Sequence, residues 1–203
     1  MGKNIGLIPL GFTEIWSASF NSAIIISAGD NAEFIAFCGI NLDITIFNKE
    51  NVYLPAFLKT YPFLNVEVEN KDKKVNSLIA IDNNPKYVAK DKKIFILDKE
   101  KNLSKQVATK VELIKELNSQ RAVCRRIIAE LKKLDLLIKK GLRVKIEGKE
   151  EKVILEEFYV INIEKLLKLD DKIIASFAKK GWMGIFDAHF KSMGNFEKIL
   201  KAN

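Results

Sequence analysis

The hydrophobic pattern of residues 5–98 is mainly that of β-strands, with short runs of β-branched and aromatic residues separated by turn-forming residues. The turn signal Ala28–Asn31 lies between two such runs and predicts a hairpin. A second hairpin is predicted around the charged stretch Lys71–Lys74, because the run before it alternates apolar and charged residues. The predicted strands are residues 23–27, 32–40, 42–48, 63–69, 76–82 and 93–98.

Residues 52–61 break this pattern, because their apolar side chains recur at helical spacing. Pro55 suits the first turn of a helix, where its missing N–H would have no helical partner. Pro62 should end the helix. So many prolines and aromatic residues in one short stretch are consistent with a binding surface or with a corner of the core, and we expect the core. The side chains that this interpretation buries are Phe57, Leu58, Tyr61 and Phe63.

Residues 104–140 contain neither glycine nor proline, and their apolar residues recur at steps of mostly three or four. This pattern predicts one long amphipathic helix. Ser104 suits its N-cap, and Gly141 suits a left-handed residue at its end.

Shorter elements follow the long helix. Residues 142–161 contain two strand patterns around a charged turn and predict a hairpin. The helices predicted beyond it cover residues 162–169, 170–181, 182–194 and 195–202. Their expected N-caps are Asn162, Asp170 and Asn195, and their expected glycine stops are Gly181 and Gly194.

These elements predict an α+β fold with an antiparallel-rich N-terminal sheet, one long amphipathic helix, a β-hairpin and a helical C-terminal tail. We expect a single domain over residues 1–203, with a strand-rich half (1–98) and a second half (104–203) that contains the helix, the hairpin and the tail. The 203 residues are 48% hydrophobic and 30% charged, which is typical of a globular protein with a sizeable core.

The net charge of +8 favours an anionic partner, but most of the excess is lysine scattered among acidic residues, as on a solvated surface. Arg121, Arg125 and Arg126 form the most basic patch, and Arg121 and Arg125 should share one face of the long helix. This patch is either a binding surface or the solvated side of that helix. The chain has none of the usual nucleic-acid-binding patterns, so we expect no nucleic-acid partner.

The inventory of catalytic and metal-binding residues is small. His189 is the single histidine, and it is either a structural residue or a general base. Cys38 and Cys124 lie far apart in apolar patterns, which indicates two buried free thiols, with a disulfide between them as the alternative. We therefore expect no metal site and no cofactor, and the residues favour a protein that is not an enzyme.

We expect no signal peptide among the N-terminal residues, since Glu14 interrupts their apolar pattern. No apolar stretch approaches the length that spans a bilayer. We expect a cytoplasmic protein.

Two segments are distinctive: YLPAFLKTYPFLNVEVE at residues 53–69 and AHFKSMGNFEKIL at residues 188–200. With looser similarity over nearly the whole chain, they resemble the bacterial SapC-like family, named for a surface-layer-associated protein. One departure is Ser22, where the resemblance implies a proline. The resemblance carries over no catalytic residue. It implies eight signature residues: Tyr53, Pro55, Tyr61, Pro62, Phe63, His189, Ser192 and Asn195.

The resemblance implies a link to surface-layer protein export. The first hypothesis is therefore a cytoplasmic accessory protein that binds a surface-layer subunit or its export apparatus. The alternative is an enzyme or small-molecule-binding protein with a pocket near His189 and the corner formed by residues 61–63.

Overall fold

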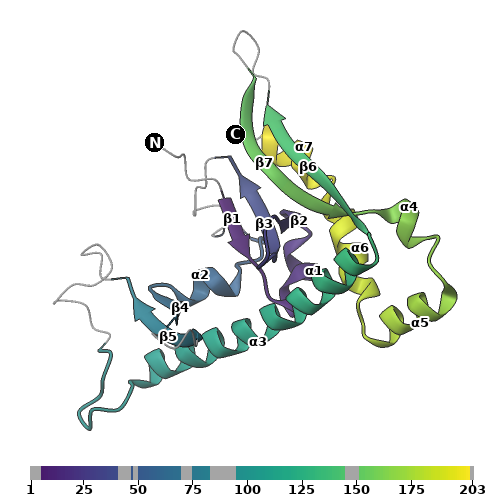
Figure 1. The fold of residues 1–203 in the computed structure, drawn as a ribbon. Coiled ribbons are helices and arrows are strands. Elements are labelled where there is room, and N and C mark those ends of the chain that lie inside the picture. The colour runs from purple at the N-terminus through teal and green to yellow at the C-terminus, as the bar shows by residue number, and fades with distance from the viewer. Residues whose placement is uncertain are drawn as a thin grey trace. The chain divides into compact units, whose positions relative to one another are not determined.

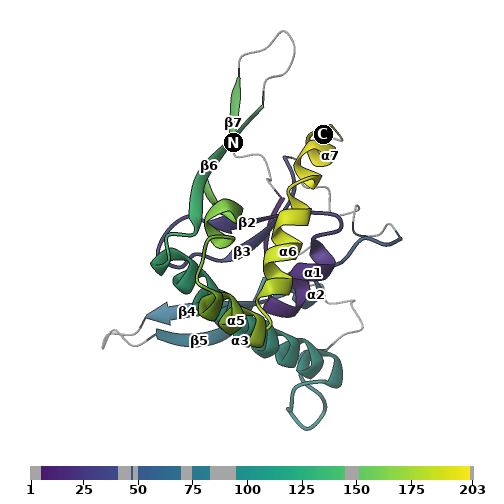
Figure 2. The ribbon, with the colours of Figure 1, turned by 90° about the vertical axis from the view of Figure 1, so that its right-hand side faces the viewer.

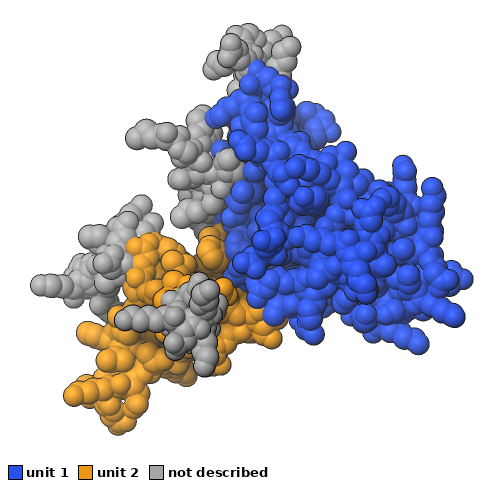
Figure 3. Space-filling view, viewed as in Figure 1, with its two compact units in different colours: residues 1–55, 120–203 blue, residues 56–119 orange. Residues whose placement is uncertain are grey.

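The computed structural model describes residues 6–40, 47, 50–69, 75–82, 95–144 and 151–201. The chain forms two compact units, shown in blue and orange in Figure 3. The first unit consists of residues 1–55 and 120–203, and the second of residues 56–119. The division does not follow the boundary between the strand-rich and helical halves, and the expectation of a single domain stays a prediction.

An antiparallel five-stranded sheet forms the centre of the first unit (Figure 1). Its strand order is β1-β3-β2-β7-β6. The strands are β1 (Gly6–Pro9), β2 (Ala23–Ser27), β3 (Phe34–Gly39), β6 (Leu137–Val144) and β7 (Lys152–Ile161). The hairpin predicted around residues 28–31 is confirmed: β2 pairs with β3, and Gly29 in the turn has a φ of 97°. The α+β class is confirmed as well.

Short helices complete the first unit: η1 (Phe12–Glu14), α1 (Ile15–Ala18), α4 (Ile163–Leu166), α5 (Asp171–Lys179), α6 (Met183–Ser192) and α7 (Asn195–Lys201). Helix α6 contacts α1, β2 and β7, and α7 contacts β3 (Figure 2). Part of the core lies between the sheet and α7, where Ile199 joins Phe37 and Phe158.

Three of the predicted helix ends are confirmed. Asn162 Oδ1 accepts a hydrogen bond from the Lys165 N–H at 3.1 Å and so caps α4. Asp170 Oδ1 accepts one from the Lys172 N–H at 2.8 Å and caps α5. Gly181 follows α5 with a φ of 72°.

The long helix α3 (Lys105–Lys133) ends earlier than predicted. Asp135 has a φ of 54°, and from Leu137 the chain continues as β6, paired with β7. Gly141, predicted to stop the helix, therefore lies within a strand, next to an irregularity in the pairing. A Cβ atom there would be only 3.0 Å from the Glu156 carbonyl oxygen, so this glycine permits a close approach between the two strands.

In the second unit, helix α2 (Ala56–Thr60) leads into strand β4 (Phe63–Glu69), which pairs antiparallel with β5 (Val75–Ile81). The predicted second hairpin is confirmed. The predicted strand at 93–98 is wrong for its described residues, which form only a bridge between Leu97 and Leu103. The predicted strand at 42–48 lies outside the described residues except for Phe47.

The core of the second unit contains Phe63 from β4 and Val107 and Ile114 from α3. Phe63 is 6% exposed, as predicted. Phe57, Leu58 and Tyr61 are also mostly buried, as predicted, but less completely than Phe63.

Candidate functional site

The buried carboxylate of Glu14 lies at the start of the candidate site. Its Oε2 accepts a hydrogen bond from the Gly11 N–H at 2.8 Å, and its Oε1 accepts one from the Tyr53 hydroxyl at 2.9 Å. Burial of the phenol, and then the charge of Glu14, raise the pKa of Tyr53 above its ordinary value. Tyr53 therefore stays protonated and anchors the segment before α2 to the first turn of η1. Pro55, two residues later, is buried.

Asn195 fixes the turn that follows α1. Its Nδ2 donates to the carbonyl oxygens of Ser19, at 2.8 Å, and Ser22, at 3.0 Å, and its side chain is buried. The expectation that Asn195 caps α7 is wrong, because α7 begins at Asn195 itself and its amide is used in this tertiary contact. Gly194 is not left-handed, so its predicted role as a stop is wrong too.

His189 and Ser192 lie three residues apart on α6, where their side chains share one face. The ladder between β2 and β7 pairs Ile26 with Tyr159 and Ser27 with Phe158, and continued pairing would bring Ile24 opposite Ile161. Instead, the Ile24 N–H donates to Ser192 Oγ at 2.9 Å, and the Ile161 N–H donates to His189 Nε2 at 3.1 Å. The two side chains thus satisfy backbone groups where the strands separate.

The imidazole of His189 is fully buried. Burial lowers its pKa to about 4. The nearby backbone of Ile24 raises the pKa, but by less than burial lowers it. Because Nε2 accepts a hydrogen bond, we assign the proton to Nδ1. Nδ1 has no hydrogen-bond partner among the described residues. A ring with no exposed surface cannot reach a substrate in this conformation.

The burial of His189 predicts a loss of stability in acid. The unfolded chain binds the imidazole proton below about pH 6.5 and the folded chain only below about pH 4, so stability falls as pH drops through this window. A shift of this size is worth up to about 3 kcal/mol. Urea unfolding at a series of pH values should show this loss in the parent and not in His189→Gln. Glutamine can accept the Ile161 N–H but does not titrate. Parallel pH curves for the two proteins would contradict this account.

Two large aromatic side chains are exposed on the segment that begins next to buried Glu14 and ends at the turn bound by Asn195. Trp16 is 49% exposed and Phe20 is 53% exposed. Their rings meet edge to face at 6.2 Å, and Lys191 Nζ lies 3.0 Å from the Phe20 centroid and 5.2 Å from that of Trp16. We call Trp16, Phe20 and Lys191 the aromatic surface. A hollow of about 320 Å³ adjoins it, lined by Ser17, Phe20, Asn21, Asn51, Val52 and Tyr53.

The aromatic surface escaped sequence reasoning. Trp16 and Phe20 are spaced by one helical turn within IWSASFNS (residues 15–22), among small and polar residues, which is a weak signal for a surface pair. Ser22, where the family resemblance implied a proline, is buried, and its Oγ lies 3.4 Å from Cys38 Sγ.

The arginines of the predicted basic patch have different surroundings. Arg121 and Arg125 share a face of α3, and both donate to the largely buried carboxylate of Glu33, Arg121 at 2.7–3.0 Å and Arg125 at 2.9 Å. They therefore fix the residues before β3. Arg126 lies instead in a separate groove with Lys180 and Trp182.

Both cysteines are free and buried. Burial raises the pKa of both thiols, that of Cys124 to about 12, so neither is a reactive thiolate. No three His, Cys, Asp or Glu side chains in the described ranges are placed to hold a metal ion. Among the helices of those ranges, none is long and apolar enough to cross a membrane.

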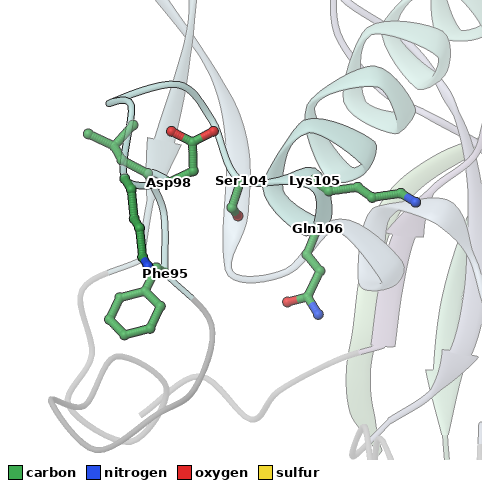
Figure 4. A pocket seen from close by; sticks show the side chains of 7 residues that line it. Phe95, Asp98, Ser104, Lys105 and Gln106 are labelled. Atoms are coloured by element: carbon green, nitrogen blue, oxygen red, sulfur yellow. The ribbon is translucent and has the colours of Figure 1, made fainter.

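The remaining signature residues, Tyr61, Pro62 and Phe63, belong to the second unit. The Tyr61 hydroxyl donates to Asp82, and Lys110 Nζ donates to the carbonyl oxygens of Lys59 and Tyr61, so these contacts fix the corner between α2 and β4. A hollow of about 700 Å³ in the same unit contains no signature residue (Figure 4). Its lining residues are Phe95, Leu97, Asp98, Lys99, Ser104, Lys105 and Gln106.

A family model described as SapC matches residues 1–199 of the chain. The comparison with curated proteins found no match, and neither did the comparison with solved structures.

Proposed function

Because the chain belongs to the SapC family, we propose that it is a cytoplasmic accessory protein of surface-layer protein export or assembly and acts by binding another protein. The observation that carries this proposal is that the signature residues of the first unit hold the segment with Trp16 and Phe20 in place. The Tyr53 hydroxyl donates to Glu14 just before this segment, and the Asn195 amide donates to the Ser19 carbonyl within it. Ser192 accepts the N–H of Ile24 just after it.

The physical chemistry of the aromatic surface supports protein binding. Tryptophan and other large aromatic side chains supply much of the binding energy at protein interfaces. Here the backbone that carries Trp16 and Phe20 is fixed at the carbonyl groups of Ser19 and Ser22, which accept hydrogen bonds from the buried amide of Asn195. A surface that is already ordered loses little conformational entropy on binding. The Lys191 ammonium adds a positive charge next to the rings, so the surface suits a partner with an apolar side chain beside a carboxylate.

The alternative, an enzyme or small-molecule-binding protein, has less support than protein binding because of the contacts of His189. Its ring has no exposed surface, and Nε2 already accepts the Ile161 N–H. Tyr61 and Phe63 belong to the other unit, where Tyr61 is engaged with Asp82 and Phe63 with the core.

The direct test is binding to surface-layer protein purified from the same organism. We expect the double variant Trp16→Ala/Phe20→Ala to bind at least about tenfold more weakly than the parent, because central aromatic residues each contribute about 1 kcal/mol or more. Calorimetry or interferometry measures the change. Leu167→Ala is the matched control: Leu167 is 78% exposed in the same unit but lies outside the aromatic surface.

Equal binding by the parent and the double variant would contradict the proposal for this surface. Failure of the parent to bind the surface-layer protein would contradict the proposed partner. Fractionation of the producing cells checks the cytoplasmic location.

A further inference from the structure

We propose that the first unit has a second binding site, a basic groove that takes an acidic segment of another protein. The groove has a volume of about 650 Å³ and lies between α3 and the connection from α5 to α6. Arg126, Glu130 and Lys133 line it from α3, and Lys180 and Trp182 line it from the connection. We call these five residues the basic groove.

The charges of the basic groove are unbalanced. Arg126, Lys133 and Lys180 contribute three positive charges, and Glu130 contributes one negative charge. Within the part of the chain that the structure describes, none of the three cations is in an ion pair. Arg121 and Arg125 on the same helix are both paired with Glu33. The groove therefore concentrates positive charge that the described residues do not neutralise, and it favours a negatively charged ligand.

Trp182 gives the basic groove a fixed apolar surface. Its ring stacks on Phe177, with centroids 5.4 Å apart, and Phe177 is fully buried. Lys180 Nζ lies 4.6 Å from the Trp182 centroid, where the ring attracts a cation and holds the ammonium in place. Val123 and Ala129 add apolar lining. The ligand should therefore carry an apolar side chain as well as acidic groups.

The spacing of the cations favours an extended acidic segment over a compact anion. Arg126 and Lys133 are seven residues apart on α3, which is about 10 Å along a helix axis. On an extended chain, carboxylates two or four residues apart lie on the same face, about 7 or 13 Å apart, which brackets this distance. A compact anion placed between the two cations would lie next to Glu130, whose charge repels it.

The basic groove is independent of the aromatic surface, so each proposal can fail alone. The experiment uses the full chain carrying Trp16→Phe, in which Trp182 is the single tryptophan and its fluorescence reports on the groove. The probe is a short peptide of glutamate residues with one central leucine. A matched peptide with glutamine in place of glutamate tests whether the charge is needed.

We expect the glutamate peptide to change the fluorescence of Trp182 in a saturable way and the glutamine peptide to bind much more weakly. Arg126→Gln, Lys133→Gln and Lys180→Gln should each weaken binding about two- to fivefold, the range for exposed charge pairs, and Arg126→Gln/Lys180→Gln about tenfold. Lys168→Gln removes an exposed lysine elsewhere in the same unit and should leave binding unchanged.

Three outcomes would overturn the proposal. The first is no saturable change up to about 1 mM peptide, a concentration at which even weak complexes form. The second is equal weakening by Lys168→Gln and by the groove variants, because binding would then depend on net charge alone. The third is tighter binding of a short DNA oligonucleotide than of the glutamate peptide, which would assign the groove to nucleic acid.

Discussion

Phe63→Ala is expected to lower the free energy of unfolding by about 3–5 kcal/mol, the usual cost of removing a buried phenyl ring. Phe63 is the aromatic member of the core of the second unit, where it packs with Val107 and Ile114 of α3. Truncation would leave a cavity between β4 and the helix, because neither element can close it without moving backbone. Urea unfolding followed by circular dichroism measures the loss.

Phe95→Ala is the matched control for this prediction. Phe95 is in the same unit but is 73% exposed, so its truncation should change stability by less than about 0.5 kcal/mol. A loss below about 1 kcal/mol for Phe63→Ala, similar to that of Phe95→Ala, would mean that residues 61–63 are not part of a core.

Phe63 is buried more completely than its neighbours for a physical reason. Phe63 starts a strand, where alternate side chains point to opposite faces, and its face meets α3. Phe57 and Leu58 belong to a helix of only five residues and keep part of their surface exposed. A helical spacing of apolar residues indicates which side chains share a face, but not how completely another element covers that face.

The end of α3 shows how tertiary pairing can decide between a helix and a strand. Leu134, Leu136 and Ile138 fit a strand period of two, whereas Leu131, Leu134 and Ile138 fit helical steps. No glycine or proline separates the two patterns, so the sequence predicts a helix up to Lys140. Pairing of Leu137–Val144 with β7 decides for the strand.

The sequence predicts which residues of the candidate site share a helix face, but not which groups they contact. The three-residue step from His189 to Ser192 places both on one face of a helix. Their partners, the backbone N–H groups of Ile161 and Ile24, come from strands far away in the sequence. The same holds for Arg121 and Arg125, whose shared face was predicted and whose common partner Glu33 was not.

Asn195→Ala is expected to lower the free energy of unfolding by about 2–6 kcal/mol. The Asn195 amide donates to two buried carbonyl groups, those of Ser19 and Ser22, and each buried acceptor left without a donor costs about 1–3 kcal/mol. Asn195→Asp should be at least as harmful at neutral pH, because a carboxylate has no N–H to donate and would face two carbonyl oxygens. Urea unfolding of the three proteins measures both losses.

Asn162 provides the matched control, since the same two substitutions should act differently at a true N-cap. Asn162 accepts a hydrogen bond from the Lys165 N–H, so Asn162→Ala should cost about 0.5–2 kcal/mol and Asn162→Asp almost nothing. Stability of Asn195→Asp equal to the parent would contradict the two hydrogen bonds from Asn195 to the carbonyl groups of Ser19 and Ser22.

If those hydrogen bonds exist, Asn195→Asp should recover stability relative to the parent as pH falls, because burial raises the pKa of the new carboxyl and its protonated form can donate one hydrogen bond. The same variant should weaken binding at the aromatic surface, whereas Asn162→Asp should not, because Asn195 donates to the backbone between Trp16 and Ile24 and Asn162 does not.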